Sequence, residues 1–68
     1  MTVFQKTLIE LRKQHKMTQR EVAKILDISQ PSYIRYENGT SEPTIENLIK
    51  LADLFDVSLD YLCGRETY

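Results

Sequence analysis

The fold of this chain is decided by the stretch from Thr18 to Gly39, TQREVAKILDISQPSYIRYENG. Thr18 and Glu21 have the spacing of a capping box, in which a hydroxyl and a carboxylate satisfy free backbone N–H groups where a helix begins. Ser29 is a second cap, and the Asn-Gly pair that closes the stretch tolerates the positive φ at which helices stop. Two short capped helices with a tight bend between them indicate a helix-turn-helix.

The second of these helices has two different faces. At about 100° per residue, Tyr33, Tyr36 and Glu37 fall on one side. The opposite side carries Gln30, Pro31, Ile34, Arg35 and Asn38. Glutamine pairs with adenine, arginine pairs with guanine, and an apolar group suits the thymine methyl. This composition favours a face that reads DNA, and the alternative is the solvated face of an ordinary amphipathic helix.

Capping residues and helical apolar spacing predict three more helices. With the central pair included, the predicted ranges are about 3–15, 18–26, 29–38, 44–55 and 58–63. No stretch alternates polar and apolar residues with a period of two, so we expect no strands. The sequence therefore predicts an all-α chain in which residues 1–68 form a single domain.

The two C-terminal helices are expected to contribute much of the core. The helix over 44–55 is the most apolar one and is expected to form the floor of the core through Ile45, Leu48, Ile49, Leu51, Ala52, Leu54 and Phe55. In the helix over 58–63, Leu59 and Leu62 are expected to face inward, with Gly64 at the C-cap position.

Charge is divided unevenly along the chain. The formal net charge is −1, but residues 1–36 carry seven Lys or Arg against three Asp or Glu, which gives +4. Residues 37–68 carry two Lys or Arg against seven Asp or Glu, which gives −5. The basic half contains the helix-turn-helix, so the pattern favours a surface for phosphate, and scattered surface charge is the alternative.

Several classes of function lack support in the sequence. Cys63 is the single cysteine, so neither an internal disulfide nor a cysteine-based zinc site is expected. The chain has no nucleophile–base pair, no metal constellation and no evident site for a cofactor or small-molecule ligand, so we do not expect an enzyme. Without an apolar run long enough to span a membrane, and without a secretory signal, a cytoplasmic protein is expected.

The chain as a whole resembles the Cro/C1-type helix-turn-helix family, which includes phage repressors and xenobiotic-response-element-like regulators. The matching residues are Leu11-Arg12, residues 17–23, Ile28-Ser29, residues 35–39, Glu42-Pro43, Leu48, Leu51-Ala52 and residues 57–62. The resemblance implies a compact five-helix, lambda-repressor-like DNA-binding domain. The helix over 29–38 would then lie in the major groove, with the helix over 18–26 crossing the DNA backbone.

The resemblance also implies roles for individual residues. It places Gln30, Pro31, Ile34 and Arg35 at base edges, and Gln19, Ser32, Asn38, Thr40 and Ser41 at or near phosphates. Replacing Gln19 is then expected to weaken binding to all sequences alike, with little change in thermal stability. Family members pair an arginine at the position of Arg12 with a glutamate at that of Glu37, which implies a structural ion pair.

The leading hypothesis is a small transcriptional repressor that binds a pseudo-palindromic operator in double-stranded DNA. Because one helix reads only a few base pairs, we expect a homodimer. The candidate dimer surface comprises Leu59, Tyr61, Leu62, Cys63 and Tyr68. In the alternative for this region, Leu59 and Leu62 cap the core, and Tyr61 and Tyr68 are surface residues.

In a second hypothesis the chain has the same helix-turn-helix fold, but its partner is a protein. Pro31 and Ile34 replace polar residues of the family pattern, and Glu42 places a negative charge in a loop that is often basic. These departures and the net acidity favour a protein-interaction module, such as an antitoxin-like adaptor. Salt-dependent binding to DNA would separate the two hypotheses.

Overall fold

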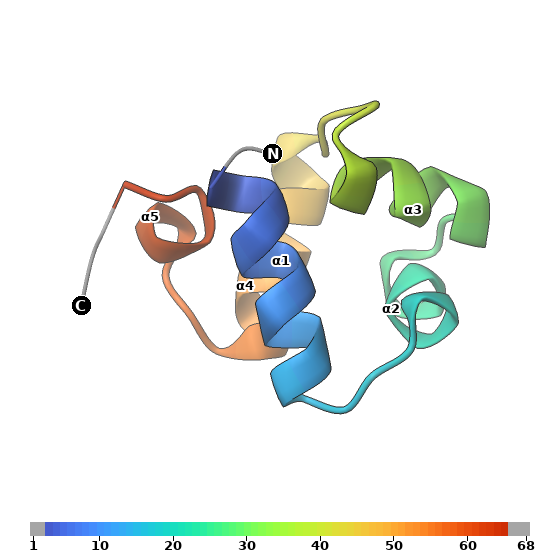
Figure 1. Ribbon diagram of the computed structural model, residues 1–68, viewed down its shortest axis with the longest axis horizontal. Coiled ribbons are helices and arrows are strands. Elements are labelled where there is room, and N and C mark those ends of the chain that lie inside the picture. Colours follow the sequence, from blue (N-terminus) through green and yellow to red (C-terminus); the bar gives the residue numbers. More distant parts are fainter. Residues whose placement is uncertain (1–2, 66–68) are drawn as a thin grey trace.

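The structure is a computed structural model that describes residues 3–65, and all regular structure in that range is helical. The helices are α1 (Val3–Gln14), α2 (Gln19–Leu26), α3 (Gln30–Asn38), α4 (Ile45–Phe55) and α5 (Leu59–Leu62) (Figure 1). The all-α prediction is confirmed, and each predicted range agrees with the observed helix to within one residue at either end. Among the described residues, no helix is long and apolar enough to cross a membrane.

The starts of the last four helices follow from their capping side chains. In each case a Ser or Thr hydroxyl with extended backbone accepts a hydrogen bond from the N–H three residues later; the caps are Thr18, Ser29, Thr44 and Ser58. At α2 the capping box is complete, because Glu21 also accepts from the Thr18 N–H at 2.8 Å. The predicted starts of these helices are one residue early because they include the cap.

The bend between α2 and α3 is built on Asp27, whose backbone is left-handed at φ 58°. Its N–H bonds to the carbonyl oxygens of Ala23 and Lys24, which ends α2 and turns the chain. Gly39 ends α3 in the same way, at φ 84°. The C-cap prediction for α5 is wrong by one residue: Cys63 is the cap, and Gly64 follows it at φ 83°.

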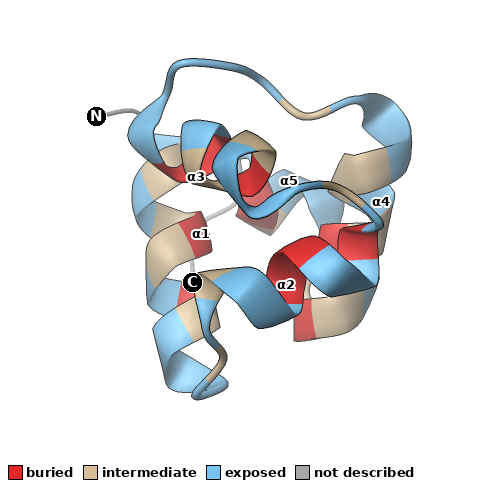
Figure 2. Ribbon diagram, turned by 90° about the vertical axis from the view of Figure 1, so that its right-hand side faces the viewer, coloured by how far each residue is buried: buried red, intermediate tan, exposed pale blue. Residues whose placement is uncertain are grey.

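The helices enclose one core, with the helix-turn-helix at one end of the long axis and α5 at the other (Figure 1). Helices α1 and α4 lie between these ends. Figure 2 shows buried residues on the sides of the helices that face one another and exposed residues on the outer sides and connections. The buried apolar residues are Leu8, Leu11, Val22, Ala23, Leu26, Tyr33, Tyr36, Leu51, Ala52, Phe55 and Leu62.

Three apolar residues that were predicted to face inward are exposed instead. Ile45 is 76% exposed, Ile49 is 44% exposed and Leu59 is 42% exposed. The apolar arc of α4 is wider than the part that its neighbours cover, so Leu51, Ala52 and Phe55 fill the core and the two isoleucines face outward. In α5, Leu62 is completely buried in the core, whereas Leu59, the first residue of the helix, is only partly covered by its neighbours.

Candidate nucleic-acid interface

The outward side of α3 is the candidate interface, and its exposure follows the predicted division of the helix. Gln30, Pro31, Arg35 and Asn38 are exposed, while Ile34 and Ser32 are half-buried. On the other side, Tyr33, Tyr36 and Glu37 are buried. The residues predicted to meet base edges thus lie together along one side of a single helix.

Hydrogen bonds that involve the hydroxyl groups of both tyrosines hold the inner side of α3 in place. Tyr33 lies in the core, and its hydroxyl donates to Glu37 Oε2 at 2.5 Å. The Tyr36 hydroxyl accepts a hydrogen bond of 3.1 Å from Asn47 Nδ2, which joins α3 to α4. The two rings also meet edge to face, with centroids 6.2 Å apart. These contacts fix the rotation of α3 about its axis and therefore the direction of its outward face.

Glu37 is the charged centre of the inner side of α3. Arg12 Nε lies 2.6 Å from Glu37 Oε2, and Arg12 Nη2 lies 3.2 Å from Oε1, so the ion pair implied by the family resemblance is present. Gln19 Nε2 donates to Oε1 at 3.0 Å. Arg12 Nη1 donates to the carbonyl oxygen of Met17 as well. One buried carboxylate therefore joins α1, α2 and α3.

These contacts also determine the protonation states of Glu37, Arg12 and Tyr33. Burial alone would raise the pKa of Glu37, but hydrogen bonds from Arg12, Tyr33 and Gln19 outweigh it and hold the pKa below its usual value. The hydrogen bond with Glu37 raises the pKa of Arg12. Burial, together with the bond to Glu37, raises the pKa of Tyr33 above its ordinary range. The network therefore holds an ionised carboxylate and a neutral phenol.

The predicted phosphate residues lie at the ends of the two central helices. Gln19 opens α2, and one N–H of its side-chain amide is already committed to Glu37. At the end of α3, Asn38 Oδ1 accepts hydrogen bonds from the Thr40 N–H at 3.0 Å and from the Thr40 hydroxyl at 2.6 Å. This leaves the Asn38 side-chain N–H groups for an outside acceptor.

The predicted serines differ in their surroundings. Ser32 is the third residue of α3, and its Oγ accepts a hydrogen bond of 2.9 Å from the Ser29 hydroxyl. Ser41 is exposed in the connection after α3. The five predicted phosphate residues therefore lie at the start of α2 and at both ends of α3, around the exposed side of α3.

The candidate dimer surface is only partly available. Leu62 is completely buried, so its placement on a surface was wrong: it fills the core between α5 and its neighbours. Leu59 and Cys63 are exposed, and Tyr61 is half-buried against the core. Tyr68 lies outside the described residues.

Among the contacts of the site that were not predicted from the residues, two differ in whether the sequence signals them. The Gln19–Glu37 bond joins positions 18 residues apart and has no local signal. The Asn38–Thr40 bonds do have one, because an Asn two residues before a hydroxyl-bearing residue at a helix end is typical of an Asx turn. Within the part of the chain that the structure describes, no group of three or more His, Cys, Asp and Glu residues is placed to hold a metal ion.

Comparison with known proteins agrees with this architecture. The sequence matches the helix-turn-helix family over residues 8–62. It is 47% identical, over 58 residues, to the cryptic phage CTXphi transcriptional repressor RstR of Vibrio cholerae, an alignment covering 85% of this chain and 52% of that protein. It is also 41% identical to the antitoxin PezA of Streptococcus pneumoniae, over 90% of this chain and 39% of that protein.

A solved structure matches over almost the whole chain. The P22 c2 repressor in complex with a synthetic operator superposes with a TM-score of 0.86 at 26% sequence identity, covering 97% of this chain and 100% of that one. By contrast, the chain spans about half the length of several curated relatives that it matches.

Proposed function

The chain belongs to the Cro/C1-type family of helix-turn-helix proteins, and we propose that it is a transcriptional repressor that binds double-stranded DNA sequence-specifically. The observation that carries the proposal is the division of α3. Its inner side is fixed by Tyr33, Tyr36 and Glu37, while Gln30 and Arg35 are exposed on the outer side. A polar, rigidly supported helix face of this kind suits the major groove.

In this proposal each residue on the outer side of α3 has a distinct task. Gln30 pairs with adenine, and Arg35 pairs bidentately with guanine. Ile34 and Pro31 make apolar contacts, of which a thymine methyl is the natural partner for Ile34. Gln19 and Asn38 donate to phosphates through their free side-chain N–H groups, with Ser32, Thr40 and Ser41 beside the backbone.

We further propose that the protein acts as a homodimer in the cytoplasm, by binding alone and without catalysis. Two copies of α3 would read half-sites about 34–36 Å apart on a pseudo-palindromic operator. Leu59 and Cys63 at α5 are the exposed candidates for the dimer surface, with Tyr61 at its edge. They lie at the opposite end of the molecule from the helix-turn-helix (Figure 1).

The test is a binding titration at several salt concentrations. An operator would first be selected from random duplex DNA with the purified full chain, and its affinity measured by fluorescence anisotropy. A dimer that makes roughly 6–10 phosphate contacts should lose about 10³–10⁵ in affinity between 50 and 200 mM salt. Failure to select a sequence, or an affinity that does not respond to salt, would contradict the proposal.

A second candidate function is protein binding on the same scaffold, as in an antitoxin-like adaptor. It is supported by the exposed isoleucines of α4, Ile45 and Ile49, and by the similarity to an antitoxin. In this case the acidic half of the chain would hold the partner. The same titration separates the two functions, because a protein-binding module without DNA affinity gives no selected sequence.

A further inference from the structure

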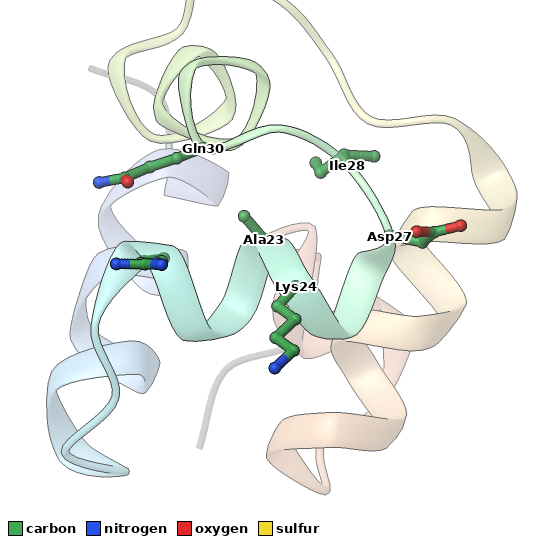
Figure 3. A pocket seen from close by; sticks show the side chains of 6 residues that line it. Ala23, Lys24, Asp27, Ile28 and Gln30 are labelled. Atoms are coloured by element: carbon green, nitrogen blue, oxygen red, sulfur yellow. The ribbon is translucent and has the colours of Figure 1, made fainter.

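An open groove lies between α2 and α3, next to the candidate interface. It is lined by Arg20, Ala23, Lys24, Asp27, Ile28 and Gln30 (Figure 3). Two of these residues are cations four positions apart on α2, and Gln30 is the first residue of α3. The groove therefore brings positive charge from α2 next to a residue that the proposed function assigns to base reading.

The two cations of the groove are not used by the fold. Within residues 3–65, neither Arg20 nor Lys24 forms an ion pair, and both side chains are exposed. Elsewhere, Arg12 is paired with Glu37, and Lys50 is paired with Glu46. An unpaired arginine with a planar fork of donors is well suited to a phosphate group.

The position of the groove distinguishes the two cations. Figure 3 shows Gln30 at the start of α3, above α2, whereas the Lys24 side chain extends downward from α2, away from α3. The Asp27 side chain lies at the far end of α2 and points away from Gln30. Arg20 directly follows Gln19, whose amide is bound to Glu37 of α3. The first turn of α2 therefore lies against α3, and Arg20 is the cation on that turn, where it lines the same groove as Gln30.

We propose that Arg20 binds a backbone phosphate at the edge of the major groove, beside the base read by Gln30. The inference rests on the proposed function. The major groove of DNA is only about 12 Å wide, so a cation on the first turn of α2, which packs against α3, lies close to the sugar–phosphate strand that flanks the base read by Gln30. Arg20 thus adds a charged contact to the neutral donors predicted at the phosphates, whereas Lys24 remains in solvent.

The experiment compares Arg20→Gln with Lys24→Gln in the full chain. Both changes remove one positive charge from the same helix, and glutamine has a helix propensity similar to both cations. Affinity for the selected operator and for a scrambled duplex is measured between 50 and 200 mM salt. Arg20→Gln should reduce the slope of log affinity against log salt by about 0.9 per protomer, or about 1.8 for a dimer, with both duplexes.

The fall in DNA affinity between 50 and 200 mM salt should therefore be about tenfold smaller for Arg20→Gln than for the wild-type protein. Lys24→Gln should leave the slope unchanged, and Arg20→Lys should restore it because it restores the charge. An unchanged slope in Arg20→Gln, with salt-dependent binding by the wild type, overturns this inference alone. Equal changes in the two glutamine variants also overturn it, since they indicate a general field effect. Wild-type protein without salt-dependent binding overturns the proposed function and this inference together.

Discussion

Gln19 Nε2 donates a hydrogen bond of 3.0 Å to Glu37 Oε1, and so the first residue of α2 is attached to the inner side of α3. The same carboxylate also binds Arg12 of α1 and the hydroxyl of Tyr33. A residue predicted to serve only DNA phosphate is therefore part of the network that orients α3. In the proposed function, DNA binding and stability are consequently coupled at Gln19.

Gln19→Ala should consequently lower both stability and DNA affinity. The variant leaves one oxygen of a buried carboxylate with one donor fewer, at a cost of about 1 kcal/mol in the free energy of unfolding. This differs from the sequence-based expectation of little change in stability. Urea denaturation and anisotropy measure the two effects. Gln14→Ala, at the exposed end of α1, is the control, and equal stability of the two variants would contradict the structural role.

Arg12→Met should be far more damaging, because it leaves Glu37 charged and buried without its cation. The expected loss is about 3–5 kcal/mol, a large part of the stability of so small a domain. Lys50→Met removes an exposed partner of Glu46 within α4 and should cost less than about 1 kcal/mol. Chemical denaturation at neutral pH compares them. Similar losses of stability in the two variants would show that the buried Arg12–Glu37 pair contributes no more to stability than the Lys50–Glu46 pair.

The stability of the protein should fall in acid in a manner that depends on Glu37. Its pKa is lower in the folded chain than the value of about 4.3 expected when unfolded, so the unfolded chain takes up this proton first. The stabilisation is complete above the unfolded pKa and is lost as the pH falls through the folded pKa. Urea denaturation between pH 7 and pH 3 should show this decline.

The matched variant for the acid profile is Glu37→Gln. It should be less stable at pH 7 but should show a shallower decline below about pH 4.3, since it carries no proton-binding group at this position. An identical slope in the wild type and the variant would mean that other carboxylates cause the acid sensitivity.

Arg35→Ala should change base preference without changing the fold. The side chain is exposed on the outer face of α3, so the melting temperature should stay near that of the wild type. Loss of a bidentate contact with guanine should cost about 1–3 kcal/mol per half-site and relax selection at that position. Glu37→Ala, two residues later and on the inner side of α3, should lower the melting temperature strongly. An equal fall in the two variants would invalidate the assignment of faces.

Replacing either leucine of α5 should have a different effect on stability, although the two residues are three positions apart and therefore lie on the same side of the helix. Leu62→Ala creates a cavity in the core and should cost about 2–5 kcal/mol, whereas Leu59→Ala should cost less than half as much because Leu59 is already 42% exposed. If Leu59 belongs to a dimer surface, its replacement should instead weaken self-association in sedimentation experiments. A larger stability loss for Leu59→Ala would reverse the assignment.

Local physical chemistry explains what the sequence determined without further help. Thr18 and Ser29 cap their helices by accepting a hydrogen bond from the backbone N–H three residues later. Asp27 turns the chain because its own backbone adopts the left-handed conformation. The two-sided pattern of α3 is also local, because the helical repeat alone separates Tyr33 and Tyr36 from the polar face. These features required no knowledge of any partner helix.

Tertiary structure decided the features that depend on neighbours. The apolar arc of α4 includes Ile45, but only the part covered by other helices is buried. Likewise, the bond between Gln19 and Glu37 exists because the fold brings α2 against α3, and no repeat in the sequence encodes that distance. Capping and periodicity act over a single helical turn, whereas burial and pairing across helices depend on how the whole chain is packed.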